Sequence, residues 1–246
     1  MKELDGKVAV ITGGAGGIGR AMGIRMAEEG MRICLSDLNE ERLAATVAEL
    51  REDGMDVIGV AANVSELSSV EALRDAAVSH FGAVDVVCNN AGVASGAHGK
   101  LWEHEINDWR FAFSVHVYGV INGINAFVPY LIDRGVETHV VNTSSNNGGF
   151  APIAMSPTYA TCKAAVVTIS ECLWGQLHEI DAKVGVSVLF PTGRTKGVLD
   201  TGIWAAAERP PGYEAAAPIS HNNQMAGWIA RLRISPGGRR DRPGAT

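Results

Sequence analysis

The sequence predicts an α/β fold, in which a single domain forms one doubly wound parallel sheet. Short, continuous apolar runs rich in β-branched residues recur along the first 193 of the 246 residues, and segments with helical periodicity separate them. Continuous apolar runs are typical of parallel strands that helices cover on both faces, whereas half-exposed strands alternate. Repeated strand–helix alternation therefore favours one doubly wound sheet.

Six strands and five helices are expected in alternation. The strands are expected at residues 7–12, 32–37, 56–64, 84–92, 138–145 and 185–193, where the apolar runs lie. The helices are expected at about 18–30, 40–53, 66–80, 108–134 and 158–181. The second helix has both end signals, since Asn39 can cap its start and Gly54 follows its end.

After residue 193 this alternation stops. Residues 194–220 are rich in Ala, Gly and Pro, and residues 234–246 are rich in Arg. The first segment follows the carboxyl end of the sixth strand, where ligands bind to such sheets, so we expect a substrate lid there. We expect the second to be a flexible tail. No linker marks a second domain, so residues 1–246 are treated as one domain with a divergent C-terminal segment.

Composition argues against several classes of function. The net charge is −6, from 21 basic and 27 acidic residues, which argues against nucleic acid as a partner. No run of about 18 uncharged apolar residues occurs and no leader pattern opens the chain, so a cytoplasmic protein without a membrane span is expected. The four cysteines are scattered, which predicts buried, reduced thiols and no metal site; they are Cys34, Cys88, Cys162 and Cys172.

A glycine-rich turn joins the first strand to the first helix. Gly13, Gly17 and Gly19 have the spacing TGxxxGxG, and the helix begins near Ile18. Glycines let the backbone approach a pyrophosphate, and the helix N-terminus offers unpaired N–H groups to it. A glycine-rich loop without a ligand is the alternative. The preceding strand, the following helix and an acid at the end of the second strand count against that alternative.

That acid is Asp37, 18 residues after Gly19. A carboxylate at this place can accept hydrogen bonds from both ribose hydroxyls of an adenosine and would repel a 2′-phosphate. NAD is therefore expected in preference to NADP. Arg20 and Arg32 lie near in sequence, and one arginine from a loop or the lid would change this balance.

Tyr159 and Lys163 are four residues apart in a helical stretch, so their side chains share one face. One interpretation is an ordinary surface pair. The other is that the ammonium lowers the pKa of the phenol and makes it an acid or base usable near neutral pH. The spacing alone leaves both open.

The glycine-rich turn and Asp37 are followed in order by "NNAG" at 89–92, "NTSS" at 142–145 and "YATCK" at 159–163. With these five motifs the chain resembles the short-chain dehydrogenase/reductase family from about residue 5 to 193. The resemblance implies one Rossmann-like domain that binds a nicotinamide cofactor. It also implies hydride transfer between C4 of the nicotinamide ring and an alcohol or carbonyl carbon.

The resemblance also assigns roles to residues. It places Asn63 and Val64 beside the adenine, and it places Asn90, Ala91 and Gly92 along the cofactor. It places Ser145 and Tyr159 at the reacting oxygen, and Lys163 on the nicotinamide ribose. These roles make chemical sense, because hydride arriving at a carbonyl leaves an alkoxide that needs a proton donor, and a neutral hydroxyl assists where negative charge develops.

The chain departs from the family pattern in three places. His116 stands where the family has an Asn that holds a water next to the lysine; it either preserves this proton relay with a new pH dependence or only fills space. Thr192 stands where Gly is usual, and Thr195 is one place early; Pro191 and Thr195 remain expected nicotinamide contacts. The C-terminus lacks the usual seventh strand, which leaves a homodimer or a homotetramer open.

The sequence thus predicts an NAD(P)-dependent alcohol dehydrogenase or ketone reductase. The alternative is a catalytically weak or silent dinucleotide-binding sensor or scaffold. Mostly apolar residues are expected to border the substrate pocket: Val93, Ala94, Phe150, Ala151, Met155, Trp204 and Tyr213. They favour a hydrophobic secondary alcohol or ketone, aromatic or alicyclic, although Arg194 could hold a carboxylate.

Overall fold

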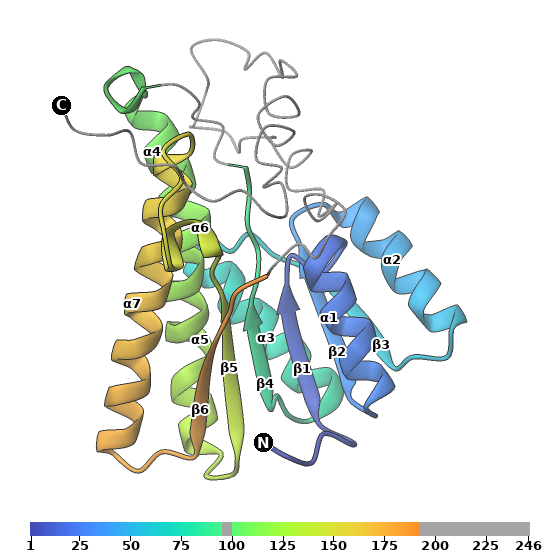
Figure 1. The fold of residues 1–246 in the computed structure, drawn as a ribbon. Coiled ribbons are helices and arrows are strands. Elements are labelled where there is room, and N and C mark those ends of the chain that lie inside the picture. The colour runs from blue at the N-terminus through green and yellow to red at the C-terminus, as the bar shows by residue number, and fades with distance from the viewer. Residues whose placement is uncertain (95–99, 192–246) are drawn as a thin grey trace, which may run out of the picture. The chain divides into compact units, whose positions relative to one another are not determined.

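A computed structural model describes residues 1–94 and 100–191. Six strands form one sheet in the order β3-β2-β1-β4-β5-β6, and every neighbouring pair is parallel (Figure 1). The strands are β1 (Val8–Thr12), β2 (Arg32–Asp37), β3 (Val57–Ala61), β4 (Val86–Asn89), β5 (Thr138–Thr143) and β6 (Val184–Leu189). The predicted doubly wound, Rossmann-like sheet is confirmed. The first three strands extend the sheet from β1 to β3, and the next three extend it the other way from β4 to β6, so the order reverses between β1 and β4. A ligand crevice is expected at the carboxyl ends of these two strands.

Helices follow the strands as predicted, with additional short turns. The long helices are α1 (Gly17–Glu28), α2 (Glu40–Glu52), α3 (Leu67–Phe81), α4 (Ile106–Phe113), α5 (Gly119–Asp133) and α7 (Pro157–Glu179). The short elements are η1 (Leu101–Glu103), the π-helical turn η2 (Ser114–Tyr118) and α6 (Asn146–Gly149). Asn39 caps α2, since its side chain accepts a hydrogen bond from Arg42 N, as the sequence predicted.

The expected helix 108–134 is interrupted where the sequence predicted continuity. Helix α4 ends at Phe113, the π turn spans Ser114–Tyr118, and α5 continues to Asp133. A π turn accommodates one extra residue in a helix, and such turns are frequent at functional sites. This one contains His116, so the irregularity coincides with the family departure noted above.

The two faces of the sheet bury separate clusters, because successive side chains along a strand point to opposite sides. Ile11 of β1 packs in a cluster with Leu43 and Leu50 of α2, and side chains of α1 border the same cluster. Val10, one residue away, packs with Leu73 and with residues of α3, α5 and α7. Helices therefore cover both faces of the sheet, as the continuous apolar strands predicted (Figure 1).

The stretch Ile106–Asp133 is long and apolar enough, by length and composition, to cross a membrane. The stretch contains polar residues such as His116 and Asn122, so it is not a continuous apolar run of the kind that the sequence lacks. In the structure 61% of its apolar window is buried, and side chains such as Phe127 and Leu131 lie in the main core. This burial is typical of a core helix of a globular protein.

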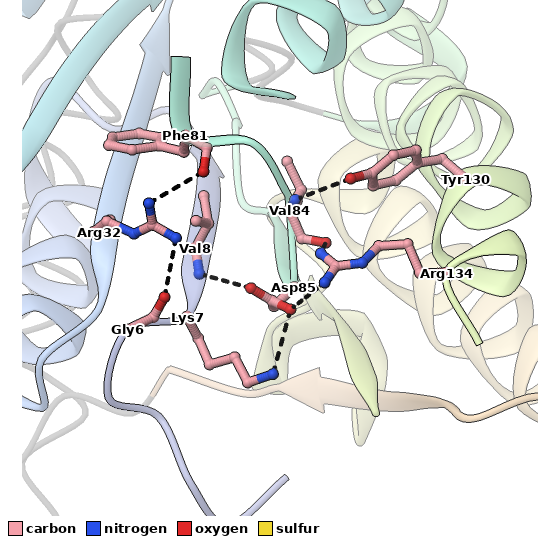
Figure 2. A network of polar contacts seen from close by, with 9 residues as sticks. All are labelled: Gly6, Lys7, Val8, Arg32, Phe81, Val84, Asp85, Tyr130 and Arg134. Carbon is pink, nitrogen blue, oxygen red and sulfur yellow. Dashed lines mark hydrogen bonds and ion pairs between the residues drawn. The ribbon is translucent and has the colours of Figure 1, made fainter. Parts of the chain in front are cut away.

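At the amino-terminal edge of the sheet, Asp85 ties several elements together (Figure 2). Its buried carboxylate accepts a hydrogen bond from Val8 N at 2.9 Å and forms ion pairs with Arg134 at 3.1 Å and Lys7 at 3.5 Å. Arg134 also donates to the carbonyl oxygen of Val84 at 2.6 Å. This network holds the edge of the sheet opposite to the expected site.

The described residues all belong to one compact unit, Met1–Glu214. The expected lid at 194–220 and tail at 234–246 lie outside the described residues. The same holds for several individual predictions: Thr192, Arg194, Thr195, Trp204 and Tyr213.

Candidate active site

The glycine-rich turn after β1 is shaped by close backbone contacts. Gly13 has a φ of +67°, and a Cβ there would lie 2.9 Å from the Cα of Ala91. A Cβ on Gly19 would collide with the carbonyl oxygen of Gly13 and lie 2.8 Å from Asn90 Nδ2. Helix α1 begins at Gly17 with no side-chain cap, so its first N–H groups remain available to an anion. The turn therefore fits a pyrophosphate.

Thr12 joins this turn to the segment after β4. Its hydroxyl accepts hydrogen bonds from Asn90 N and Ala91 N, both at 3.0 Å, and donates to Cys88 O at 3.3 Å. Asn90 Nδ2 donates to Thr12 O at 3.0 Å, and Thr143 of β5 donates to Asn90 Oδ1 at 3.2 Å. The predicted residues Asn90 and Ala91 are thus brought to the turn. Sequence reasoning missed Thr12 and Thr143, although both stand at strand ends.

Asp37 also lies against the glycine-rich turn. Its Oδ2 accepts a hydrogen bond from Ala15 N at 3.2 Å, and its Oδ1 accepts one from Asn39 N at 3.1 Å. The carboxylate at the end of β2 therefore borders the turn, as predicted for a residue that binds ribose. The side chain of Asn63, predicted near the adenine, forms hydrogen bonds with Ser65 and Glu66 in the turn before α3.

Val64, the other residue predicted near the adenine, packs against the start of α5. A Cβ on Gly119 would lie 3.0 Å from Val64 Cγ2. The carbonyl oxygen of Val64 accepts a hydrogen bond from Asn122 Nδ2 at 2.9 Å. These contacts fix the loop that follows β3.

Tyr159, Lys163 and Ser145 come together at the carboxyl end of β5. The hydroxyl of Ser145 lies close enough to the phenol of Tyr159 to lower the pKa of that phenol. Lys163 Nζ lies 5.5 Å from the centroid of the Tyr159 ring and donates to Thr143 O at 2.8 Å. Ser144, beside Ser145, donates to Lys163 O at 2.8 Å and is buried, which fits a structural role. The shared helix face of Tyr159 and Lys163 follows from their positions in α7.

The acidity of Tyr159 differs from the prediction. Burial raises the pKa of Tyr159, and the hydrogen bond from Ser145 only opposes this shift. Lys163 is not among the groups that shift this pKa, so the interpretation in which the ammonium lowers it is not borne out by the surroundings of the phenol. The ammonium lies beside the ring and bonds the Thr143 carbonyl, and its own burial lowers the pKa of Lys163 to about 8.

His116 lies in the same site, inside the π turn. Its ring meets that of Tyr159 edge-on, with centroids 5.2 Å apart, and its Nε2 lies 2.8 Å from Val93 O. Donation to this carbonyl requires the proton on Nε2, and Val93 N lies 3.4 Å from the same nitrogen. Within the described part of the chain Nδ1 has no hydrogen-bond partner, and it faces Gly92, where a Cβ would lie 3.3 Å from it.

Burial, reinforced by the charge of Lys163, lowers the pKa of His116 to about 3. The bond to Val93 opposes the shift without reversing it. The imidazole is therefore neutral near pH 7. Of the two alternatives for His116, the one in which it titrates near neutrality and adds a pH dependence there is disfavoured, because the ring is 1% exposed.

Apolar side chains border the serine end of the site. Phe150 is 74% exposed, and its ring lies 4.5 Å from that of Phe190. A Cβ on Gly149 would lie 3.1 Å from Phe190 Cδ1 and 3.2 Å from Ser144 Oγ. Phe150 was predicted to border the pocket, whereas Phe190 was missed because it reads as the end of a strand. Pro191 is half-buried and follows it directly.

One cysteine differs from its prediction. Cys34, Cys88 and Cys162 are buried, but Cys172 is exposed on α7. The apolar periodicity of α7 does not distinguish this position from buried ones. Among residues 1–94 and 100–191 no group of His, Cys, Asp and Glu side chains is arranged to hold a metal ion.

Comparison with protein families matches residues 7–206 to the family described as short chain dehydrogenase. The chain belongs to this family. This short-chain dehydrogenase is 36% identical over 201 residues to 1-deoxy-11-beta-hydroxypentalenate dehydrogenase of Streptomyces avermitilis, a match that covers 80% of the chain and 73% of that protein. It is also 36% identical over 191 residues to 2,5-dichloro-2,5-cyclohexadiene-1,4-diol dehydrogenase LinX of Sphingobium indicum, covering 78% of the chain and 74% of LinX.

Among solved structures, a short-chain dehydrogenase/reductase from Burkholderia phymatum in complex with NAD matches with a TM-score of 0.84. The two are 40% identical, and the match covers 97% of this chain and 83% of the other. The fold of that short-chain dehydrogenase/reductase is therefore shared along nearly all of this chain.

Proposed function

We propose that this short-chain dehydrogenase is an NAD-dependent alcohol dehydrogenase or ketone reductase whose substrate is a hydrophobic secondary alcohol or ketone. The observation that carries the proposal is the assembly of Ser145, Tyr159 and Lys163 at the sheet edge that also holds the glycine-rich turn. A sensor or scaffold would need the turn and Asp37 only. The convergence of proton-transfer groups favours an enzyme.

The residues fit a dinucleotide. Gly13, Gly17, Ile18 and Gly19 would hold its pyrophosphate, because Gly13 and Gly19 leave no room for a side chain and the first N–H groups of α1 have no side-chain cap. Asp37 would hold the adenosine ribose, Asn63 and Val64 would border the adenine, and Asn90, Ala91, Gly92, Pro191 and Lys163 would border the nicotinamide half. When bound, NAD supplies the carbon that accepts or donates the hydride.

Tyr159 transfers the proton. At neutral pH its raised pKa keeps the phenol protonated, which suits donation to the oxygen of a ketone. Ser145 donates a hydrogen bond wherever negative charge develops on that oxygen. Alcohol oxidation requires the phenolate, which the positive charge of an oxidised nicotinamide ring would favour.

His116 completes the site as a neutral group. Its ring packs on Tyr159 and orients the phenol, while its unpaired Nδ1 can accept a hydrogen bond in place of the family's Asn. A neutral His here avoids a second positive charge beside Lys163. We propose that it supports the proton relay without titrating itself near neutral pH.

The substrate class rests on the rings of Phe150 and Phe190 and on the names of the relatives, two of which act on alicyclic alcohols by their titles. The test follows NAD reduction by absorbance with alicyclic and aromatic secondary alcohols and with carboxylated analogues. Turnover of the neutral alcohols supports the proposal. Preference for a carboxylated analogue would contradict the substrate class, and NAD binding without any turnover would favour the sensor or scaffold.

We also propose a cytoplasmic homodimer or homotetramer without a nucleic-acid or membrane partner. Exposed aromatic side chains on the helical layer, Tyr118 and Trp174, support association of that layer with a second copy. Light scattering after size-exclusion chromatography tests this, and a monomer at micromolar concentration would contradict it.

A further inference from the structure

The guanidinium of Arg42 lies on the glycine-rich turn. A Cβ on Gly16 would collide with Nη2 of Arg42 and would lie 2.7 Å from its Cζ. Arg42 thus occupies the space that a side chain at position 16 would fill. This contact brings a cation from the first turn of α2 to the backbone that fits a pyrophosphate.

Asp37 also contacts this glycine-rich turn. Asp37 bonds Ala15 N, the residue before Gly16, and α2 is anchored there by Thr46, whose hydroxyl donates to Ala15 O at 2.9 Å. Asn39 links the two charged groups, because its N–H donates to Asp37 and its side chain accepts from Arg42 N. A carboxylate and a guanidinium therefore border one short stretch of backbone where the adenosine ribose is expected.

The two arginines that the sequence singled out are engaged elsewhere. Arg20 is paired with Glu49, and Arg32 donates to Phe81 O and Gly6 O at the opposite edge of the sheet (Figure 2). Arg42 is exposed, and no carboxylate in residues 1–94 and 100–191 lies within ion-pair distance of its guanidinium. Its N–H donors can bind a ligand at the turn.

We propose that Arg42 is a cofactor-specificity residue: its guanidinium binds the 2′-phosphate of NADP, so that the chain accepts NADP beside NAD. The inference rests on the proposed dinucleotide site. A planar guanidinium matches phosphate oxygens in bidentate geometry, and such charge-assisted bonds are stronger than neutral ones. Asp37 favours the free ribose diol, and Arg42 offsets its repulsion of a 2′-phosphate.

The test measures binding of two adenosine probes to the full-length protein by calorimetry, with no turnover required. The probes are 2′,5′-ADP, which carries the 2′-phosphate, and 5′-ADP, which lacks it. Arg42→Ala is expected to weaken 2′,5′-ADP about 10- to 100-fold and 5′-ADP less than about threefold. Higher salt is expected to weaken 2′,5′-ADP more than 5′-ADP in the wild type.

Arg20→Ala is the matched control, because Arg20 is also near the turn in sequence but is paired with Glu49. It is expected to leave both affinities unchanged. Equal losses for both probes in Arg42→Ala, or no loss for 2′,5′-ADP, would overturn the inference. Wild-type protein that binds 5′-ADP but not 2′,5′-ADP would overturn it while leaving the proposed function intact; binding of neither probe would overturn both. Urea unfolding of each variant establishes that it is folded.

Discussion

Replacing His116 by Asn is expected to make the protein less sensitive to acid. In the folded protein burial and the Lys163 charge hold the pKa of His116 at about 3, against 6.5 for an ordinary His. Between these values the unfolded chain binds a proton at this position and the folded chain does not. Stability is therefore lost as pH falls through this window, and it is retained above 6.5.

The size of this effect follows from the two pKa values. Between about pH 7.5 and about pH 5.5, His116 alone removes about 1.4 kcal/mol of unfolding free energy, and about 2.7 kcal/mol by about pH 4.5. Other titrating groups contribute equally to the wild type and to His116→Asn, so they cancel in the difference. The variant loses packing against Tyr159, which lowers its stability at every pH but does not change the difference in slope.

Urea unfolding at a series of pH values measures the difference. The free energies of wild type and His116→Asn are expected to converge as pH falls, and His116→Gln should give the same slope as His116→Asn. Parallel curves would refute the reasoning, since they would mean that the imidazole is protonated as readily in the folded protein as in the unfolded chain.

Two further predictions concern the acids at opposite edges of the sheet. Asp37→Ala should lower the ratio of kcat/KM with NAD to kcat/KM with NADP by about tenfold or more, and an unchanged ratio would show that Asp37 does not contact the ribose. Asp85→Ala should lower the free energy of unfolding by about 3 kcal/mol, because it leaves Val8 N and Arg134 without their buried partner. Asp75→Ala, which removes an exposed partner of Arg74, should cost less than about 1 kcal/mol in the same urea experiment, and equal losses would contradict the role of Asp85.

Much of the fold could be predicted because it depends on local pattern. All six strands appear where continuous apolar runs lie, and the helix that follows Asn39 begins where its cap predicts. The π turn at Ser114–Tyr118 could not be predicted, since an insertion of one residue leaves the apolar periodicity almost unchanged.

The sequence indicated which residues come together in the site, but it did not indicate their pKa values. The side chains of Ser145, Tyr159 and Lys163 meet because strand ends and one helix face place them together. The pKa values of Tyr159 and Lys163 depend on burial, and that of His116 depends also on a bond to Val93, 23 residues away. Likewise, the contact between Arg42 and Gly16 joins two turns that are distant in sequence, and no motif signals it.

The most direct test of the proposed chemistry is Tyr159→Phe. This change keeps the ring that packs against His116 and removes only the hydroxyl, which is next to Ser145. NAD should bind within about threefold of the wild-type affinity, while turnover of the best secondary alcohol should fall at least ~10²-fold. Near-normal turnover, or a loss of turnover matched by an equal loss of NAD binding, would contradict the assignment of Tyr159 as the proton-transfer group.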